Sequence, residues 1–419
     1  MSIGYACKTV GVPNTDMKSC TLKNASSEKL TELSKYNINA LKNTIDYNIE
    51  NNINLFRISS DLIPFGSSEI NKVKWWEIFY DELESIGQMV KKSNMRVSVH
   101  PGQYTVLNSN SEEVVQRAIN DLLYHTRILD SLGLNSKHKM VLHIGGAYGD
   151  KESSIKRFIE NYNKLDDNIK NRLVIENDDK IYSIEEVLEI GIKHNIPVIF
   201  DNLHNEINPA KENIDEEYWI EQCKLTWKKE DGNQKIHYSQ QAKNKKIGSH
   251  SDFIQINEFM KFYEKLHRKD IDIMLEVKDK NLSCVKCINC TTPDITINVL
   301  EKEWSKYKYT ILERSHSDYL EIRKLLKNKQ EFLPISFYNI LESGINNEGD
   351  TGSYMNAALH VWGYFKDKAT ETEKKNFFKY LEKYEQKESG INTAKNYLKK
   401  LAEKYKEPYL LNSYYFIMY

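Results

Sequence analysis

The sequence lacks the features that mark membrane, secreted and disordered proteins. No apolar run approaches the roughly 20 residues that cross a bilayer, and the first residues, MSIGYACKTVG, lack the basic and then apolar segments of a signal peptide. Only six cysteines occur in 419 residues, which argues against a disulfide framework. Hydrophobic residues make up 40% and charged residues 28%, as is usual for globular proteins. We therefore expect a globular protein of the cytoplasm with no membrane partner.

An excess of positive charge is also missing. The chain has 59 Lys and Arg residues against 60 Asp and Glu residues, so no overall positive field attracts a nucleic acid. A nucleic-acid partner would have to be bound by a local patch. Carboxylates that hold cations count as negative in this balance, although the bound cations neutralise them.

Short, apolar, β-branched runs alternate with longer amphipathic stretches over the first three quarters of the chain, which is typical of repeated βα units. Serines that could cap helices precede several of these stretches, at Ser26, Ser27, Ser111 and Ser183. No GxGxxG motif follows Cys7, which disfavours an open dinucleotide-binding sheet. Eight runs in succession predict a closed (β/α)₈ TIM barrel. The expected strands are Ile3–Cys7, Leu55–Ser59, Arg96–Val99, Met140–Ile144, Leu173–Glu176, Val198–Asp201, Lys235–Tyr238 and Ile271–Val277.

The β pattern stops after about Thr292, and the rest of the chain has helical patterns rich in Tyr, Phe, Leu and Lys. Turn residues at 343–353 (SGINNEGDTGS) and at Gly390 divide these patterns. We expect a barrel domain over residues 1–310 and a smaller all-α domain over residues 311–419. The aromatic and lysine residues of the second domain are typical of packing with a solvated face.

Histidines and carboxylates gather where the expected strands end, which is where TIM barrels place their reacting groups. Any one of them could be an ordinary polar residue that closes a strand. Eleven histidines spread over the chain should place about one at these ends, yet four lie there and a fifth lies close by. The candidate ligands are His100, His143, Glu176, Asp201, His204, His237, His250 and Glu276.

Imidazole mixed with carboxylate suits Zn²⁺, Mn²⁺ or Fe²⁺, whereas an all-oxygen set would suit Mg²⁺ or Ca²⁺. These eight candidate ligands are more than one ion needs. We therefore expect two or three divalent ions, a grouping that suits phosphodiester cleavage. Glu176 is the expected bridge, because its strand lies between the strands that carry the other ligands.

Nine short strings resemble those of the UV damage endonucleases, which are distant relatives of endonuclease IV. The resemblance covers roughly residues 1 to 300. It implies a TIM-barrel enzyme, a monomer without an organic cofactor, that binds damaged double-stranded DNA. It further implies hydrolysis of the phosphodiester 5′ to a UV photoproduct, leaving a 3′-hydroxyl and a 5′-phosphate. In chain order the strings are GYACKTVG, FRISSDLIPFGS, VSVHPGQY, LHIGG, VIENDD, IFDNLHN, KIHYS, HSDFI and MLEVKDK.

Carried over to this sequence, the family's metal ligands are the eight residues above, with Mn²⁺ expected ahead of Zn²⁺ or Fe²⁺. Endonuclease IV relatives have an Asp two residues before the loop histidine, where this chain has Gly248. The resemblance implies that Lys235 could be carboxylated and so supply that ligand; the alternative is a lysine that contacts phosphate. The expected catalytic residues are Glu176, Lys235 and Glu276.

The expected DNA contacts lie around the same strand ends. In the resembling family, the pair that corresponds to Gln103 and Tyr104 wedges into the duplex opposite the lesion; the alternative is a loop tyrosine packed on the barrel rim. Gly102 would allow the tight bend that exposes this pair. The remaining candidates are a lesion-side aromatic residue, a polar residue facing it, and three cations that could hold phosphate or form salt bridges: Tyr5, Lys8, Arg57, Lys278 and Lys280.

Cys284, Cys287 and Cys290 have C-x2-C-x2-C spacing. A metal or an iron–sulfur cluster would need a fourth ligand, so packing is the favoured interpretation. Three alternatives to the photoproduct endonuclease stay open: an endonuclease IV-like enzyme for abasic sites, a metal-dependent sugar isomerase or epimerase, and a protein that binds damaged DNA without cleaving it.

Overall fold

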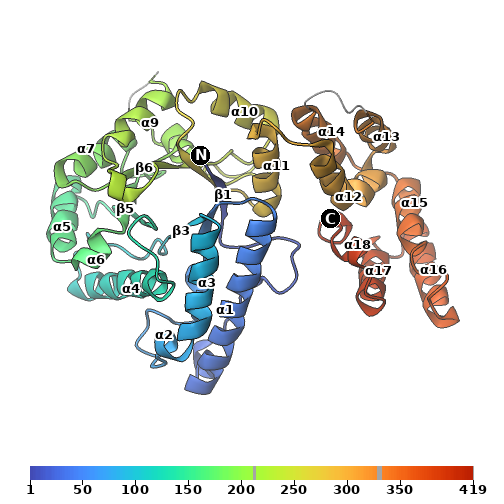
Figure 1. Ribbon diagram of the computed structural model, residues 1–419, viewed down its shortest axis with the longest axis horizontal. Helices are drawn as coiled ribbons and strands as arrows, with labels where there is room; N and C mark the ends of the chain where they lie inside the picture. The colour runs from blue at the N-terminus through green and yellow to red at the C-terminus, as the bar shows by residue number, and fades with distance from the viewer. Residues whose placement is uncertain (211–213, 328–332, 419) are drawn as a thin grey trace. The chain divides into compact units, whose positions relative to one another are not determined.

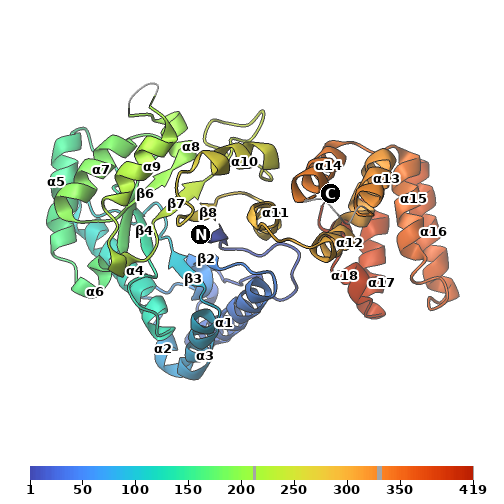
Figure 2. The same cartoon turned by 45° about the horizontal axis from the view of Figure 1, so that its top comes forward.

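The computed structural model describes residues 1–210, 214–327 and 333–418. Its first part is a closed barrel of eight parallel strands that follow one another in sequence order, and helices surround these strands (Figures 1 and 2). The predicted TIM barrel is confirmed. The strands are β1 (Ile3–Ala6), β2 (Leu55–Ile58), β3 (Arg96–Val99), β4 (Met140–His143), β5 (Leu173–Glu176), β6 (Val198–Asp201), β7 (Lys235–Tyr238) and β8 (Asp272–Leu275).

Each strand has four residues, and nearly all of them are buried. Strands buried on both faces read as continuous apolar runs, which is why the sequence predicted them well. The expected ends differ from the observed ones by at most two residues. β1 stops one residue early because Cys7 takes a positive φ of 70°, which breaks the ladder.

The predicted serine caps lie at the starts of three barrel helices. Ser26 accepts a hydrogen bond from Lys29 N, Ser111 accepts one from Val114 N, and Ser183 precedes α7. Such bonds satisfy donors that the helix itself leaves open. The helices of this part are α1 (Ser27–Glu50), α2 (Trp75–Ile78), α3 (Tyr80–Lys92), α4 (Glu112–Ser131), α5 (Lys151–Asn163), α6 (Asp167–Lys170), α7 (Ile184–His194), α8 (Asn202–Ile207), α9 (Glu216–Lys224), α10 (Ile256–Lys265) and α11 (Asn281–Thr291).

The chain divides into two compact units, one of residues 1–254 and 261–288 and one of residues 255–260 and 289–419. Among the described residues, no strand follows β8, and the turn predicted at 343–353 separates α14 from α15. The second unit packs around a core that includes Trp362 stacked on Phe377 with 4.7 Å between ring centroids. Its helices are α12 (Ile297–Arg314), α13 (His316–Leu325), α14 (Pro334–Asn346), α15 (Thr351–Trp362), α16 (Glu371–Glu385), α17 (Asn392–Lys404) and α18 (Pro408–Leu411).

Within the described residues, no helix combines the length and the apolar character that crossing a bilayer requires.

Candidate active site

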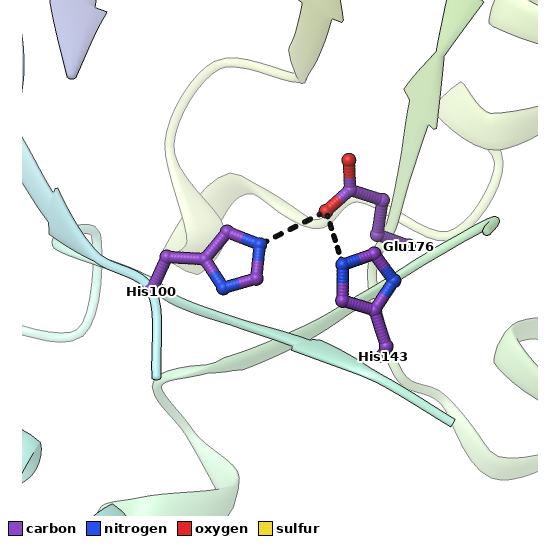
Figure 3. A group of neighbouring side chains, drawn as sticks. All are labelled: His100, His143 and Glu176. Atoms are coloured by element: carbon purple, nitrogen blue, oxygen red, sulfur yellow. Dashed lines mark ion pairs between the residues drawn. The ribbon is translucent and has the colours of Figure 1, made fainter. Parts of the chain in front are cut away.

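Glu176 is the residue around which the candidate ligands gather. It ends β5 and is 1% exposed. Its Oε2 atom lies 3.3 Å from Nε2 of His100 and 3.6 Å from Nε2 of His143. Figure 3 shows both imidazole rings turned toward this carboxylate. Its Oε1 atom accepts a 2.6 Å hydrogen bond from Nδ1 of His237. Within the described part of the chain, two groups of side chains are close enough to hold a metal ion, and both contain Glu176: His100 with His143, and Asp201 with His237.

Three more predicted ligands lie at the edge of these groups. His204 Nδ1 is 3.8 Å from Oδ1 of Asp201 and 3.8 Å from Oε1 of Glu176. His250 Nε2 is 3.8 Å from Oε2 of Glu276. The structure thus brings all eight predicted ligands to the carboxyl ends of the strands, in a chain of neighbouring side chains.

The charges of this group depend strongly on one another. Burial favours a protonated Glu176, but His237 and His143 outweigh it and hold the pKa of the carboxyl well below its usual value. Burial raises the pKa of Asp201 to about 7 and lowers that of His237 to about 4. At His204 burial is outweighed by Asp201 and Glu176, which raise the imidazole pKa to about 9. Such opposed shifts are typical of functional sites.

Several buried atoms of these side chains have no hydrogen-bond partner among the described residues. They are Oε2 of Glu176, Oδ2 of Asp201 and Nδ1 of His143. Buried polar atoms are normally paired, so unpaired atoms clustered on neighbouring candidate ligands favour the binding of a further group among them. Imidazole and carboxylate donors match Zn²⁺, Mn²⁺ or Fe²⁺, and the residues therefore fit divalent ions.

The cysteine triplet contributes nothing to these groups. Cys284, Cys287 and Cys290 are all buried in α11. Among the described residues, the groups that could hold a metal contain no cysteine. This agrees with the packing interpretation.

Lys235 lies on β7 two residues before His237, so both side chains point into the barrel. Its Nζ atom is buried, without a hydrogen-bond partner among the described residues. Burial, with Arg96 and Arg57 nearby, holds the lysine pKa well below its usual value. This burial disfavours a direct contact between Lys235 and a DNA phosphate, which was the alternative for this residue. A neutral amine is the form that reacts with carbon dioxide, and the pKa shift therefore supports carboxylation.

Arg57 takes the salt-bridge role that was its alternative. It is 7% exposed, its Nη1 atom lies 2.6 Å from Oε1 of Glu276, and its Nη2 atom donates to Nε2 of His237 over 2.8 Å. Because His237 donates from Nδ1 and accepts at Nε2, the neutral ring is held at both nitrogens. Arg57 thus orients two ligands and is not open to solvent.

The turn after β3 presents the expected probe pair. Gln103 and Tyr104 are exposed, Tyr104 to 68%, and Thr105 N donates to the oxygen of Gly102 to close the turn. A Cβ atom on Gly102 would lie 2.4 Å from the Tyr104 ring. The glycine therefore permits the position that the tyrosine takes, and packing of Tyr104 on the rim is not what the structure shows.

Tyr5 does not fit the role expected of it. It is 0% exposed, and its hydroxyl hydrogen-bonds to Thr9 and to Asn48 of α1. The alternating pattern of β1 turns this ring outward toward the helix layer, which the sequence alone did not reveal. Lys8 and Lys278 are exposed, and Lys278 pairs with Asp252 over 2.9 Å. Lys280 is partly exposed.

Sequence reasoning missed a buried network, here called the α4 brace, that supports the same turn. Asp121 and His125 lie one turn apart on α4. Asp121 Oδ2 accepts from the Thr105 hydroxyl at 2.7 Å, and His125 Nε2 lies 3.0 Å from Oγ of Ser60. Ser60 in turn donates to the backbone oxygen of His100 over 3.0 Å. The spacing Asp121-x3-His125 was the available signal, because it places two polar residues on the buried, apolar face of an amphipathic helix.

Asp179 is a second residue that the sequence analysis passed over. Its Oδ2 atom lies 3.5 Å from the position that a Cβ atom on Gly248 would take. The carboxylate of Asp179 therefore lies beside Gly248, the position at which endonuclease IV relatives have an Asp. A cavity of about 300 Å³ opens nearby, lined by His143, His204, the 101–106 turn and loop 178–181. The acidic string VIENDD, which begins within β5 and ends at Asp179, was the signal.

Comparisons with known proteins agree with this geometry. Residues 1–305 match the model of the family described as UV-endonuclease UvdE, and residues 308–419 match a family described as a protein of unknown function, DUF1722. A UV DNA damage endonuclease of Clostridium perfringens is 41% identical over 419 residues, 99% of each chain. One of Bacillus cereus strain B4264 is 34% identical over 64% of this chain and 84% of its own. The crystal structure of SacUVDE, at 38% identity and a TM-score of 0.65, covers 72% of this chain and 99% of that chain.

Proposed function

Because this chain belongs to the UV-endonuclease UvdE family, we propose that it nicks double-stranded DNA immediately 5′ to UV photoproducts and leaves a 3′-hydroxyl and a 5′-phosphate. One observation carries the proposal: two metal-capable groups share Glu176 at the carboxyl ends of the strands. We assign the nuclease to residues 1–310 and leave the helical residues 311–419 without a role.

The proposed cofactor is two or three divalent ions, Mn²⁺ ahead of Zn²⁺ or Fe²⁺. When bound, such ions supply charge neutralisation at the phosphate and lower the pKa of a water molecule. Glu176 would bridge them. Lys235, once carboxylated, would supply the oxygen ligand that is missing because Gly248 stands where endonuclease IV relatives have an Asp. The full proposed set is His100, His143, Glu176, Asp201, His204, Lys235, His237, His250 and Glu276.

Arg57 and Glu276 position the site from the side of β2. Their 2.6 Å ion pair keeps the carboxylate ionised, because Arg57 outweighs burial and holds the Glu276 pKa well below its usual value. Arg57 also fixes the His237 ring. We therefore place Arg57 among the residues that orient the ligands.

Gln103 and Tyr104 would recognise damage by entering the duplex. A crosslinked pyrimidine pair stacks poorly and is cheaper to extrude, so selection rests on the energy of unstacking. A planar amide and an aromatic ring replace the stacking that the flipped bases lose. The cavity beside His143 and His204 is where we place an extruded base. Lys8, Lys278 and Lys280 would hold phosphates; Tyr5, being buried, is left out.

A nicking assay tests the proposal. We expect cleavage of an irradiated duplex that requires divalent metal, stops on chelation and maps 5′ to the lesion. Equal cutting of undamaged duplex would contradict it. A duplex with one abasic site measures the endonuclease IV-like alternative, and turnover of an aldose or ketose without DNA would favour the isomerase.

A further inference from the structure

The loop between β7 and His250 projects an apolar side chain from the active-site end of the barrel. Residues 241–250, here called the β7 finger, fold back on themselves: Gln241 and His250 form an antiparallel bridge, and Ala242 N donates to the oxygen of Ser249 at 2.7 Å. At the tip, Ile247 is 73% exposed. Burial of such a side chain in a complex would be favourable.

The finger holds Ile247 in place through one side chain. Gln241 Nε2 donates to the oxygen of Lys246 over 3.1 Å, and Gln241 Oε1 accepts from Gly248 N over 2.8 Å. These are the peptide groups on both sides of Ile247. Gly248 has a φ of +85°, a conformation that favours glycine. Ile247 is therefore exposed on a loop whose backbone is fixed by hydrogen bonds.

The charges around the tip suit a phosphate backbone. Lys243, Lys245 and Lys246 are exposed in the same finger, and Lys245 shares Asp252 with Lys278. A chain with a net charge of −1 gathers three lysines within four residues at this point. Charge complementarity thus favours DNA as the occupant.

The topology sets the finger opposite the probe turn. In a closed barrel of eight strands in sequence order, β3 and β7 lie four strands apart, on opposite sides of the ring. Tyr104 follows β3 and Ile247 follows β7. Both stand at the carboxyl ends, with the candidate ligands between them.

We propose that the β7 finger is a second DNA-contacting wedge, in which Ile247 enters the duplex from the side opposite Gln103 and Tyr104 while its lysines hold the flanking phosphates. Apolar wedges of this kind unstack a base step and kink the duplex. The inference rests on the proposed function, because it assigns a substrate contact to the same site.

Ile247→Ser in the full chain tests the wedge, with Ile247→Leu as the variant that keeps it. The probe is a duplex with one cyclobutane thymine dimer and a 2-aminopurine beside it, whose fluorescence rises when the base unstacks. We expect Ile247→Ser to weaken binding about tenfold and to lose most of the fluorescence rise, and Ile247→Leu to retain both. Lys243→Gln with Lys246→Gln should reduce the salt dependence of binding without changing that rise.

Leu225→Ser is the matched control. Leu225 is 72% exposed, but it follows α9 and precedes Thr226, whose hydroxyl accepts from Val198 N at the start of β6. It therefore lies at the amino ends of the strands, and its substitution should change nothing.

The outcomes separate the two proposals. Wild-type protein that fails to nick the damaged duplex would overturn the proposed function. Wild-type nicking with an Ile247→Ser variant that binds and unstacks DNA normally would overturn the wedge alone. Loss of bound metal in Ile247→Ser would also overturn it, because the residue would then act through His250.

Discussion

At the scale of single residues, Glu176 is the group on which the proposed chemistry depends. Both metal-capable groups contain it, and its Oε2 atom faces two imidazoles. We expect Glu176→Ala to lower nicking by at least about 100-fold. Removing a residue that only hydrogen-bonds to a metal ligand already costs about 10–100-fold in metal affinity, and Glu176 is itself a proposed ligand. DNA binding should stay largely intact.

Nicking rates, metal content and DNA binding are the measurements, with circular dichroism as the check on folding. Glu32→Ala is the matched control, because Glu32 is an exposed carboxylate of α1 that pairs with Lys29 over 2.9 Å. Activity that survives Glu176→Ala would overturn the metal hypothesis.

Lys235 is the residue whose chemical form most affects the ligand count. Its Nζ atom is buried, and burial lowers its pKa well below the usual value. We expect protein prepared in bicarbonate to carry one added carbon dioxide, seen as a mass increase or as extra density at Nζ. Lys235→Met should lose it, whereas Lys139→Met should keep it, because Lys139 pairs with Asp231. Unmodified lysine alone under bicarbonate would refute carboxylation.

At the scale of elements, the limits of the strands could be predicted from the sequence, but the contacts that support the loops after the strands could not. β3, β5, β6 and β7 begin and end where the sequence analysis put them, because short apolar runs between polar loops determine strand limits. Six of the eight ligands followed, since they lie within one residue of a strand end; His204 in α8 and His250 in the loop after β7 do not. Side-chain direction was harder: Tyr5 points to the helix layer, and a four-residue strand buried on both faces shows no alternation from which to infer this.

The α4 brace illustrates a contact that no local pattern gives. Thr105 and Asp121 lie 16 residues apart, and their bond depends on how α4 docks beside the turn. We expect Thr105→Val, which replaces the hydroxyl with a methyl group, to leave Asp121 Oδ2 short of a partner at a cost of about 1–3 kcal/mol. The turn that carries Tyr104 should loosen.

The readout is a rise in KM for photoproduct duplex of about tenfold with metal content unchanged. Thr105→Ser should restore wild-type behaviour, and Thr31→Val on the exposed face of α1 serves as the control. Loss of kcat alone, or no effect in Thr105→Val, would contradict a positioning role for the brace.

At the scale of the whole molecule, a chain with 59 basic and 60 acidic residues must bind DNA through a few local cations. The candidates Lys8 and Lys280 follow β1 and β8, at the active-site end of the barrel. Each lysine that contacts a phosphate steepens the plot of log affinity against log salt by about 0.9. We expect Lys8→Gln and Lys280→Gln each to lower that slope by about one, equally on damaged and undamaged duplex, because phosphates carry no lesion information.

Lys229→Gln is the control. Lys229 lies before β7 at the amino ends of the strands, and its substitution should leave the slope unchanged. A similar fall with Lys229→Gln would mean that DNA binds through diffuse charge, and the assignment of Lys8 and Lys280 as contacts would be wrong.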